Sequence, residues 1–146
     1  MKNIVIFSGT TEGRMLSSML SKDGRPHHVC VATEYGKEVM EEDRYAKVHV
    51  GRMDEKEMEA FFGELENDEN SLVFDATHPY ATEVTENIKN AAKAAGLRYV
   101  RVIRGEAGDE PEGVMKYPDV KAIASAMNES TGRMLLTTGS KELECF

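Results

Sequence analysis

Residues 2–20 read KNIVIFSGTTEGRMLSSML. An apolar run with β-branched residues, Ile4–Phe7, leads into a loop with two glycines, Gly9 and Gly13, and then into apolar residues at helical spacing. This order predicts a strand, a tight loop and a helix. The first N–H groups of such a helix are unpaired and lie at the positive end of its dipole. The loop is therefore a predicted site for an anion such as phosphate.

The loop differs from the common dinucleotide-binding fingerprint, which has three glycines in G-x-G-x-x-G order. Here only two glycines occur, with three residues between them. A structural turn without a ligand is thus the alternative interpretation, although the first strand–loop–helix unit of a doubly wound sheet is where phosphate sites occur. The residues predicted to hold the phosphates of a nucleotide are Gly9, Thr10, Thr11, Glu12, Gly13 and Arg14.

Composition and charge exclude several classes of protein. Of the 146 residues, 40% are hydrophobic and 30% are charged, as in an ordinary globular domain. The formal net charge of −8 argues against nucleic acid or an anionic membrane as partner, because both attract basic surfaces. No apolar run approaches the roughly 20 residues of a membrane span, and the first residues do not form a signal peptide, so we expect a cytoplasmic protein. No His, Cys or Asp group has metal-ligand spacing, and no metal is expected.

Strand-like and helix-like segments alternate along the first hundred residues. Asp54 and Glu57 predict a capping box at the start of one helix, and Gly96 marks the end of another. The alternation predicts an α/β fold with a Rossmann-like, doubly wound parallel sheet. The expected strands after the first are residues 28–32, 45–50, 72–74 and 99–103.

Ligands of such sheets bind beyond the carboxyl ends of the strands. This rule brings four separate polar or glycine-containing loops to one rim of the sheet, and their convergence is stronger evidence for a binding site than any one of them. The loops after the second, third and fourth strands add to the predicted cofactor site Thr33, Glu34, Tyr35, Gly36, Gly51, Arg52, Asp75, Ala76 and Thr77.

The loop after the second strand bears on the choice of nucleotide. A carboxylate such as Glu34 accepts hydrogen bonds from ribose hydroxyls and favours NADH, whereas a 2′-phosphate prefers hydroxyls and cations such as Thr33, Lys37 and Arg52. The alternative is that Glu34 and Lys37 are ordinary surface charges. The sequence therefore leaves NADPH and NADH open.

The composition changes after Arg104. We predict a dinucleotide-binding domain over residues 1–104, a glycine-rich acidic linker over 105–113, and the incomplete start of a second α/β domain over 114–146. In this last part we expect strands near residues 114–117 and 134–136 and a helix over 118–128. Because open strand edges recruit partners, self-association through this part is expected.

Four motifs in this order resemble the precorrin-6A reductase family, including its cobalt-precorrin-6A branch. They are SGTTEGR at 8–14, DATHPYA at 75–81, YVRV at 99–102 and LTTGSK at 136–141. The resemblance covers the whole chain and implies an oxidoreductase of cobalamin biosynthesis. Such an enzyme transfers a hydride from NADPH or NADH to a double bond of a tetrapyrrole macrocycle and gives the 6B form.

The resemblance also implies roles for individual residues. Reduction of a conjugated double bond needs a proton as well as a hydride, so His78 is a candidate donor and Tyr80 a second one, with water as an alternative. Arg101 and Arg104 would bind carboxylates of the macrocycle, the alternative being salt bridges to surface acids. The residues expected to face the cleft from the second half are Thr138, Gly139, Ser140 and Lys141.

Length is the point of departure from the family. Its members continue through a full second half, whereas this sequence ends as that half begins, so we expect these 146 residues to bind cofactor without turnover. A non-catalytic nucleotide-binding or redox-sensing module is the alternative function.

Overall fold

A computed structural model describes residues 3–40, 43–105, 112–129 and 131–146, with the backbone alone at Ser140 and Lys141. The chain divides into two compact units, Met1–Gly105 and Glu106–Phe146. The strands are β1 (Ile4–Ser8), β2 (His27–Val31), β3 (Ala46–Val50), β4 (Leu72–Ala76) and β5 (Arg98–Arg101). The helices are α1 (Thr11–Lys22), α2 (Glu34–Glu38), α3 (Glu55–Glu64), α4 (Thr82–Ala94), α5 (Val120–Asn128) and the 3₁₀ helix η1 (Ser140–Cys145).

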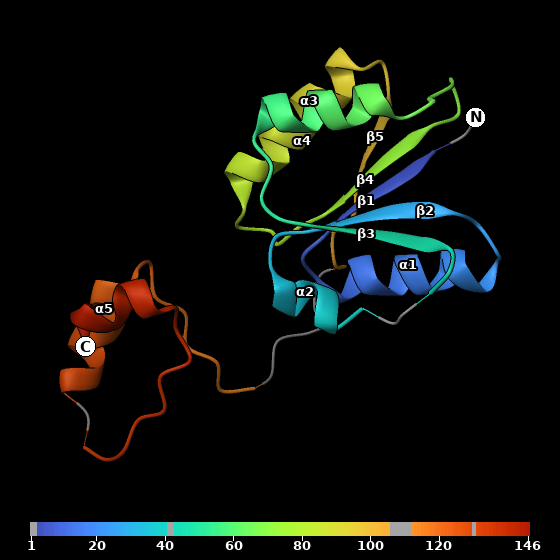
Figure 1. Ribbon diagram of the computed structural model, residues 1–146. Helices are drawn as coiled ribbons and strands as arrows, with labels where there is room; N and C mark the ends of the chain where they lie inside the picture. Colours follow the sequence, from blue (N-terminus) through green and yellow to red (C-terminus); the bar gives the residue numbers. More distant parts are fainter. Residues whose placement is uncertain (1–2, 41–42, 106–111, 130) are drawn as a thin grey trace. The chain divides into compact units, whose positions relative to one another are not determined.

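The first unit is a parallel five-stranded sheet in the order β3-β2-β1-β4-β5. Helices α1 and α2 cover one face, and α3 and α4 cover the other (Figure 1). The predicted doubly wound parallel sheet is therefore confirmed. Strand order reverses between β1 and β4, and this switch point is where the carboxyl ends of parallel strands leave a crevice.

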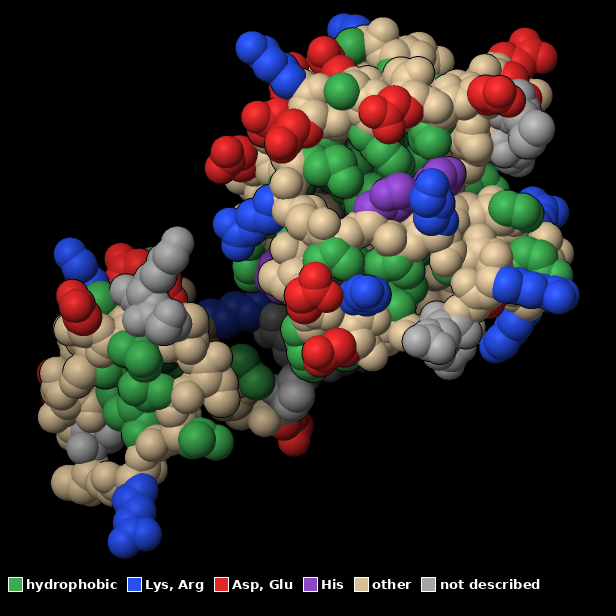
Figure 2. Space-filling view, viewed as in Figure 1, with side chains coloured by type: hydrophobic (Ala, Val, Ile, Leu, Met, Phe, Trp, Pro, Cys, Tyr) green, Lys and Arg blue, Asp and Glu red, His purple; other side chains and the backbone are tan. Residues whose placement is uncertain are grey.

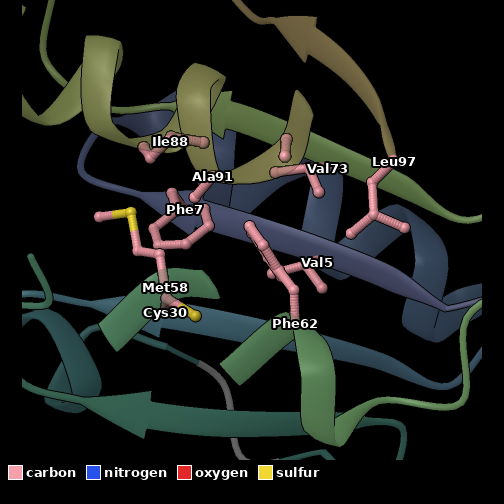
Figure 3. Close-up of a cluster of buried hydrophobic side chains, with 10 residues drawn as sticks. Val5, Phe7, Cys30, Met58, Phe62, Val73, Ile88, Ala91 and Leu97 are labelled. Carbon is pink, nitrogen blue, oxygen red and sulfur yellow. The ribbon is translucent and has the colours of Figure 1, made fainter. Parts of the chain in front are cut away.

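The main hydrophobic core lies between the sheet and helices α3 and α4 (Figure 3). Val5 and Val73 from neighbouring strands pack beneath Ile88 of α4 and Phe62 of α3, and all four are almost fully buried. This burial explains why β1 and β4 are nearly continuous apolar runs, since a strand covered on both faces has no solvent side.

Helix α3 begins as the sequence predicts. The Asp54 carboxylate accepts the backbone N–H of Glu57 at 2.9 Å, and the Glu57 carboxylate accepts the backbone N–H of Asp54 at 2.8 Å. The predicted capping box is thus confirmed. Helix α4 ends at Ala94, and Gly96 follows with a φ of 68°, a conformation that favours glycine.

The second unit differs from the expectation. Helix α5 forms, with Asp119 as its cap, but residues 114–117 and 134–136 form no strand. A strand forms only when a second strand is hydrogen-bonded to it, and the described part of this unit contains no strand at all. The prediction of two strands here is therefore wrong. Among the described residues, none of the helices combines the length and apolar character that crossing a membrane would demand.

Two histidines on β2 and β3 contact each other. His28 Nδ1 and His49 Nε2 are 2.9 Å apart, with ring planes within 19° and centroids 5.2 Å apart. That centroid distance fits an in-plane N–H···N hydrogen bond rather than a face-to-face stack, because each nitrogen then lies on the line between the rings. Phe61 packs against both rings. In Figure 2 histidine side chains border hydrophobic and basic ones.

Acid is expected to weaken the fold through this pair. Burial lowers the pKa of both His28 and His49 below the ordinary 6.5, with Lys47 adding to the effect. The unfolded chain therefore binds protons before the folded one. The pair's contribution to stability is present above pH 6.5 and lost as pH falls through the lowered values. The rings are half exposed, and solvent screens their charge. We therefore expect the free energy of unfolding to fall by only about 1 kcal/mol when both histidines become protonated.

Urea unfolding between pH 5 and 8 measures this effect. The control is His49→Gln, which leaves a single imidazole and should flatten the pH dependence. Equal pH profiles for the two proteins would contradict the assignment to this pair.

Candidate functional site

A cleft of about 790 Å³ opens at the carboxyl edge of the sheet. It runs from the ends of β1, β2 and β3 to the first turns of α3 and α4. Its floor is apolar and includes Phe7, Cys30 and Met58, and burial raises the pKa of the Cys30 thiol to about 12, so this thiol stays protonated and unreactive. The predicted site residues that line the cleft are Gly9, Gly51, Arg52, Thr77, His78 and Tyr80.

The glycine loop is joined to the loop after β4. The Ala76 carbonyl accepts the backbone N–H of Gly9 at 3.1 Å and the hydroxyl of Thr10 at 3.0 Å. Because the Thr10 hydroxyl points to that carbonyl, the N-terminus of α1 has no side-chain cap. Helix α4 likewise begins after Ala81 without a side-chain cap, whereas α2, α3 and α5 are capped by side chains. The two helices that flank the switch point thus present uncapped N–H groups.

The two glycines of this loop differ in how much room a side chain would have. A Cβ at Gly13 would lie 2.6 Å from Ser8 Oγ and 3.1 Å from Ala76 Cβ, too close for helix α1 to rest on the sheet. A Cβ at Gly9 would touch Thr77 Cα at 3.4 Å, an ordinary contact, and Gly9 also lines the cleft. Gly13 therefore serves helix–strand packing, whereas Gly9 is a lining residue of the cleft that lies against the backbone of Thr77.

The charged residues of the loop are paired within the protein. Arg104 Nε donates to Glu12 Oε1 at 2.8 Å, and this hydrogen bond lowers the pKa of Glu12 to about 2. Arg14 Nη2 donates to Thr11 Oγ1 at 3.1 Å. Arg104, predicted to bind substrate, and Glu12, predicted to bind cofactor, thus contact each other at an exposed position.

Residues 33–36, in the segment that follows β2, are not part of the cleft lining, although Ala32 is. Thr33 Oγ1 accepts the backbone N–H of Gly36 at 3.1 Å and caps the short helix α2, while Glu34 and Tyr35 are exposed. These four residues follow β2 at the same edge of the sheet as the cleft. Their predicted contact with an adenosine ribose stays a prediction.

Asp75 is fully buried, although it was expected to contact cofactor. Its Oδ1 accepts the backbone N–H of Thr77 at 3.0 Å, the hydroxyl of Thr77 at 2.7 Å and Nη1 of Arg101. Its Oδ2 accepts the Tyr99 hydroxyl at 2.9 Å. Burial, followed by this hydrogen bond, raises the pKa of Tyr99 to about 12. Asp75 therefore has four donors from its own chain, and the Arg101 guanidinium is already occupied by an acid of the protein.

The two predicted catalytic residues lie together on the loop between β4 and α4. The rings of His78 and Tyr80 are 5.3 Å apart, and His78 Nδ1 accepts the backbone N–H of Tyr80 at 3.3 Å. That hydrogen bond places the proton of a neutral His78 on Nε2. Both side chains are exposed and line the cleft. Neither Asp75 nor Thr77 caps α4, because the helix begins only at Thr82.

Several residues of the site escaped the sequence analysis. Tyr99 could have been found from its two-residue spacing to Arg101, which puts both side chains on one face of β5. Asp54 and Glu57 were predicted to cap α3, but their position in the cleft lining was not predicted. The additional polar residues that line the cleft are Ser8, Asp54, Glu57, Thr82, Glu83 and Asn87.

The remaining predicted residues belong to the second unit. Thr138 and Gly139 precede η1, and Ser140 and Lys141 are its first two residues. Their predicted role at the substrate stays a prediction. No group of three or more His, Cys, Asp or Glu side chains suited to a metal ion occurs among the described residues.

Comparison with known proteins gives one consistent result. A cobalt-precorrin-6A reductase of Salmonella typhimurium is 31% identical over 144 residues, which are 97% of this chain and 53% of that protein. The corresponding Priestia megaterium enzyme is 27% identical over 143 residues, 98% of this chain and 54% of that protein. The chain thus spans about half the length of the curated relatives it matches.

The fold and the family agree. A solved structure of the CobK precorrin-6A reductase superposes with a TM-score of 0.68 at 22% identity, covering 86% of this chain and 49% of that one, and so supports the fold. The family model described as precorrin-6x reductase CbiJ/CobK matches residues 3–146. The chain therefore belongs to the precorrin-6x reductase family.

Proposed function

We propose that this chain is the nucleotide-binding part of a cytoplasmic oxidoreductase of cobalamin biosynthesis. The whole enzyme would reduce one double bond of the precorrin-6A or cobalt-precorrin-6A macrocycle with NADPH or NADH and give the 6B form. Family membership supports the reaction class. The observation that carries the cofactor proposal is the cleft at the switch point of the sheet, because its lining includes Gly9 of the loop that leads into the uncapped helix α1.

The residues present fit a dinucleotide. The N–H groups at the start of α1 suit the pyrophosphate, and Gly9 lets the backbone approach it closely. Arg52 lines the cleft as a cation next to the acids Asp54 and Glu57. When bound, the reduced nicotinamide would supply the hydride.

The protein's own groups would handle the proton and the substrate. We assign the proton to Nε2 of His78, since Nδ1 already accepts a hydrogen bond, and Tyr80 is the second candidate. Arg104 is exposed, and its contact with Glu12 leaves it within reach of substrate carboxylates, whereas Arg101 is held by Asp75. Removal of Arg104 would therefore weaken substrate binding without loss of a buried partner.

Calorimetric titration of the chain with NADPH and with NADH tests the proposal. We expect one of the two to bind, and Gly9→Val to weaken that binding by about tenfold or more, because the added side chain would press on the backbone of Thr77 and His78 at the edge of the cleft. Gly63→Ala is the matched control, since a Cβ at Gly63 in α3 meets nothing within 4 Å. Binding of neither nucleotide by the wild-type chain would contradict the proposal. Tight binding together with no turnover in a full-length enzyme would favour the non-catalytic module instead.

A further inference from the structure

We infer that Arg101 is a positioning residue of the proposed cofactor site and acts through the loop between β4 and α4, residues 77–81. This inference rests on the proposed function. Among the described residues that line the cleft none comes from β5, so Arg101 does not touch the space that a cofactor would fill. Arg101 can therefore affect the shape of the cleft only through the residues to which it donates hydrogen bonds.

One guanidinium fastens the start of this loop at several points. Arg101 lies opposite Asp75 in the register of β4 and β5. Its Nη1 donates to the Asp75 carboxylate, to the Asp75 carbonyl at 3.3 Å and to Thr77 Oγ1 at 2.9 Å. Its Nη2 donates to the His78 carbonyl at 3.4 Å. The same carbonyl accepts the backbone N–H of Ala81 at 2.9 Å, so Arg101 supports the turn that leads into α4.

The fastened loop is in turn part of the glycine loop's support. The Ala76 carbonyl, between Asp75 and Thr77, accepts the N–H of Gly9 and the hydroxyl of Thr10. Gly9 also lies beside the Thr77 backbone, since a Cβ added at Gly9 would be in ordinary contact with Thr77 Cα at 3.4 Å. A shift of residues 76–78 would therefore move the loop that is proposed to receive the pyrophosphate.

An arginine is required for this arrangement, and a lysine is not sufficient. The guanidinium is planar and has five donors in a fixed fork, so it reaches a carboxylate, a hydroxyl and a carbonyl at once. A lysine ammonium at position 101 would still neutralise the buried Asp75 but is a point charge on a flexible stem. Arg101→Lys thus separates the positioning of the loop from the pairing of the buried charge.

Tyr99 provides the contrasting contact. Its hydroxyl donates to Oδ2 of Asp75, whereas the N–H and hydroxyl of Thr77 both donate to Oδ1. Among the described residues, Tyr99 thus reaches Asp75 on the side away from the loop. Tyr99→Phe should therefore lower stability through Asp75 without moving the loop. Arg98 is a second reference, because it lies on the same strand with an exposed side chain.

The experiment compares Arg101→Lys, Tyr99→Phe and Arg98→Lys with wild type by thermal melting, nucleotide calorimetry and NMR hydrogen exchange. We expect Arg101→Lys and Tyr99→Phe to lower the melting temperature by a similar amount, about 4 °C. Only Arg101→Lys should weaken nucleotide binding, by about tenfold, and speed exchange of the Thr77 and Ala81 amides by a similar factor. Arg98→Lys should change none of these.

The outcomes separate this inference from the cofactor proposal. If nucleotide affinity and amide exchange follow the melting temperature equally in Arg101→Lys and Tyr99→Phe, Arg101 is only a stability residue and the inference is overturned. If the wild-type chain binds neither nucleotide, the cofactor proposal fails, while the exchange of Thr77 and Ala81 still decides whether Arg101 holds the loop.

Discussion

Replacement of Arg101 by methionine is expected to lower the free energy of unfolding by about 3–5 kcal/mol, because the substitution leaves a buried carboxylate without its cation. Asp75 is fully buried, and Arg101 is the cation that contacts it. Methionine fills a similar volume but donates no hydrogen bond. Urea denaturation followed by circular dichroism measures the loss.

A double-mutant cycle gives the control for this prediction. Asp75→Asn removes the charge and keeps the shape, so the double variant with Arg101→Met should be more stable than Arg101→Met alone. The two substitutions contact each other and are expected to be strongly non-additive. If the losses of unfolding free energy in the two single variants add up to the loss in the double variant, the effect of Arg101→Met comes from lost packing. The explanation by an unpaired buried charge would then be wrong.

The second large effect is expected at Phe62 in α3. This side chain is 1% exposed and meets Phe7 of β1 edge to face, with ring centroids 6.2 Å apart, in the core of Figure 3. Phe62→Ala should cost about 3–5 kcal/mol, the sum of lost burial and of the cavity that remains. The melting temperature and urea midpoint report the loss.

Phe61 is the matched control, because it precedes Phe62 on the same helix and is only partly buried beside His28 and His49. Phe61→Ala should cost clearly less than Phe62→Ala. It should also alter the acid-dependent part of the stability, which Phe62→Ala should leave unchanged. Equal losses at the two positions would contradict the burial argument.

The sequence identified most of the first unit because its signals are local. The apolar run Ile4–Phe7, the glycine loop and the helical spacing after it each depend on neighbouring residues, and the observed β1 and α1 follow them. The same holds for the capping box of Asp54 and Glu57, in which both partners lie within one turn. Strand ends were less accurate: the fifth strand was expected to reach residue 103 and ends at Arg101.

Local patterns failed where a segment needs a distant partner. Residues 114–117 and 134–136 have strand-like composition but form no strand, since a strand exists only when another pairs with it. Arg101 and Arg104 were predicted to bind substrate carboxylates, with salt bridges to acids of the protein as the alternative. The guanidinium of Arg101 contacts Asp75, 26 positions earlier, and no spacing rule along the chain predicts that contact.

The sequence by itself determined the family, the doubly wound sheet and the rim at which we propose the site, because motifs and hydrophobic periodicity are properties of short segments. The tertiary structure decided which rim residues line a cleft and which are held by their own chain. That division depends on the pairing of β4 with β5 and of β1 with β4. These pairings bury Asp75, bind Arg101 to it and join Ala76 to Gly9, so that a charge that looks free in the sequence is paired inside the protein.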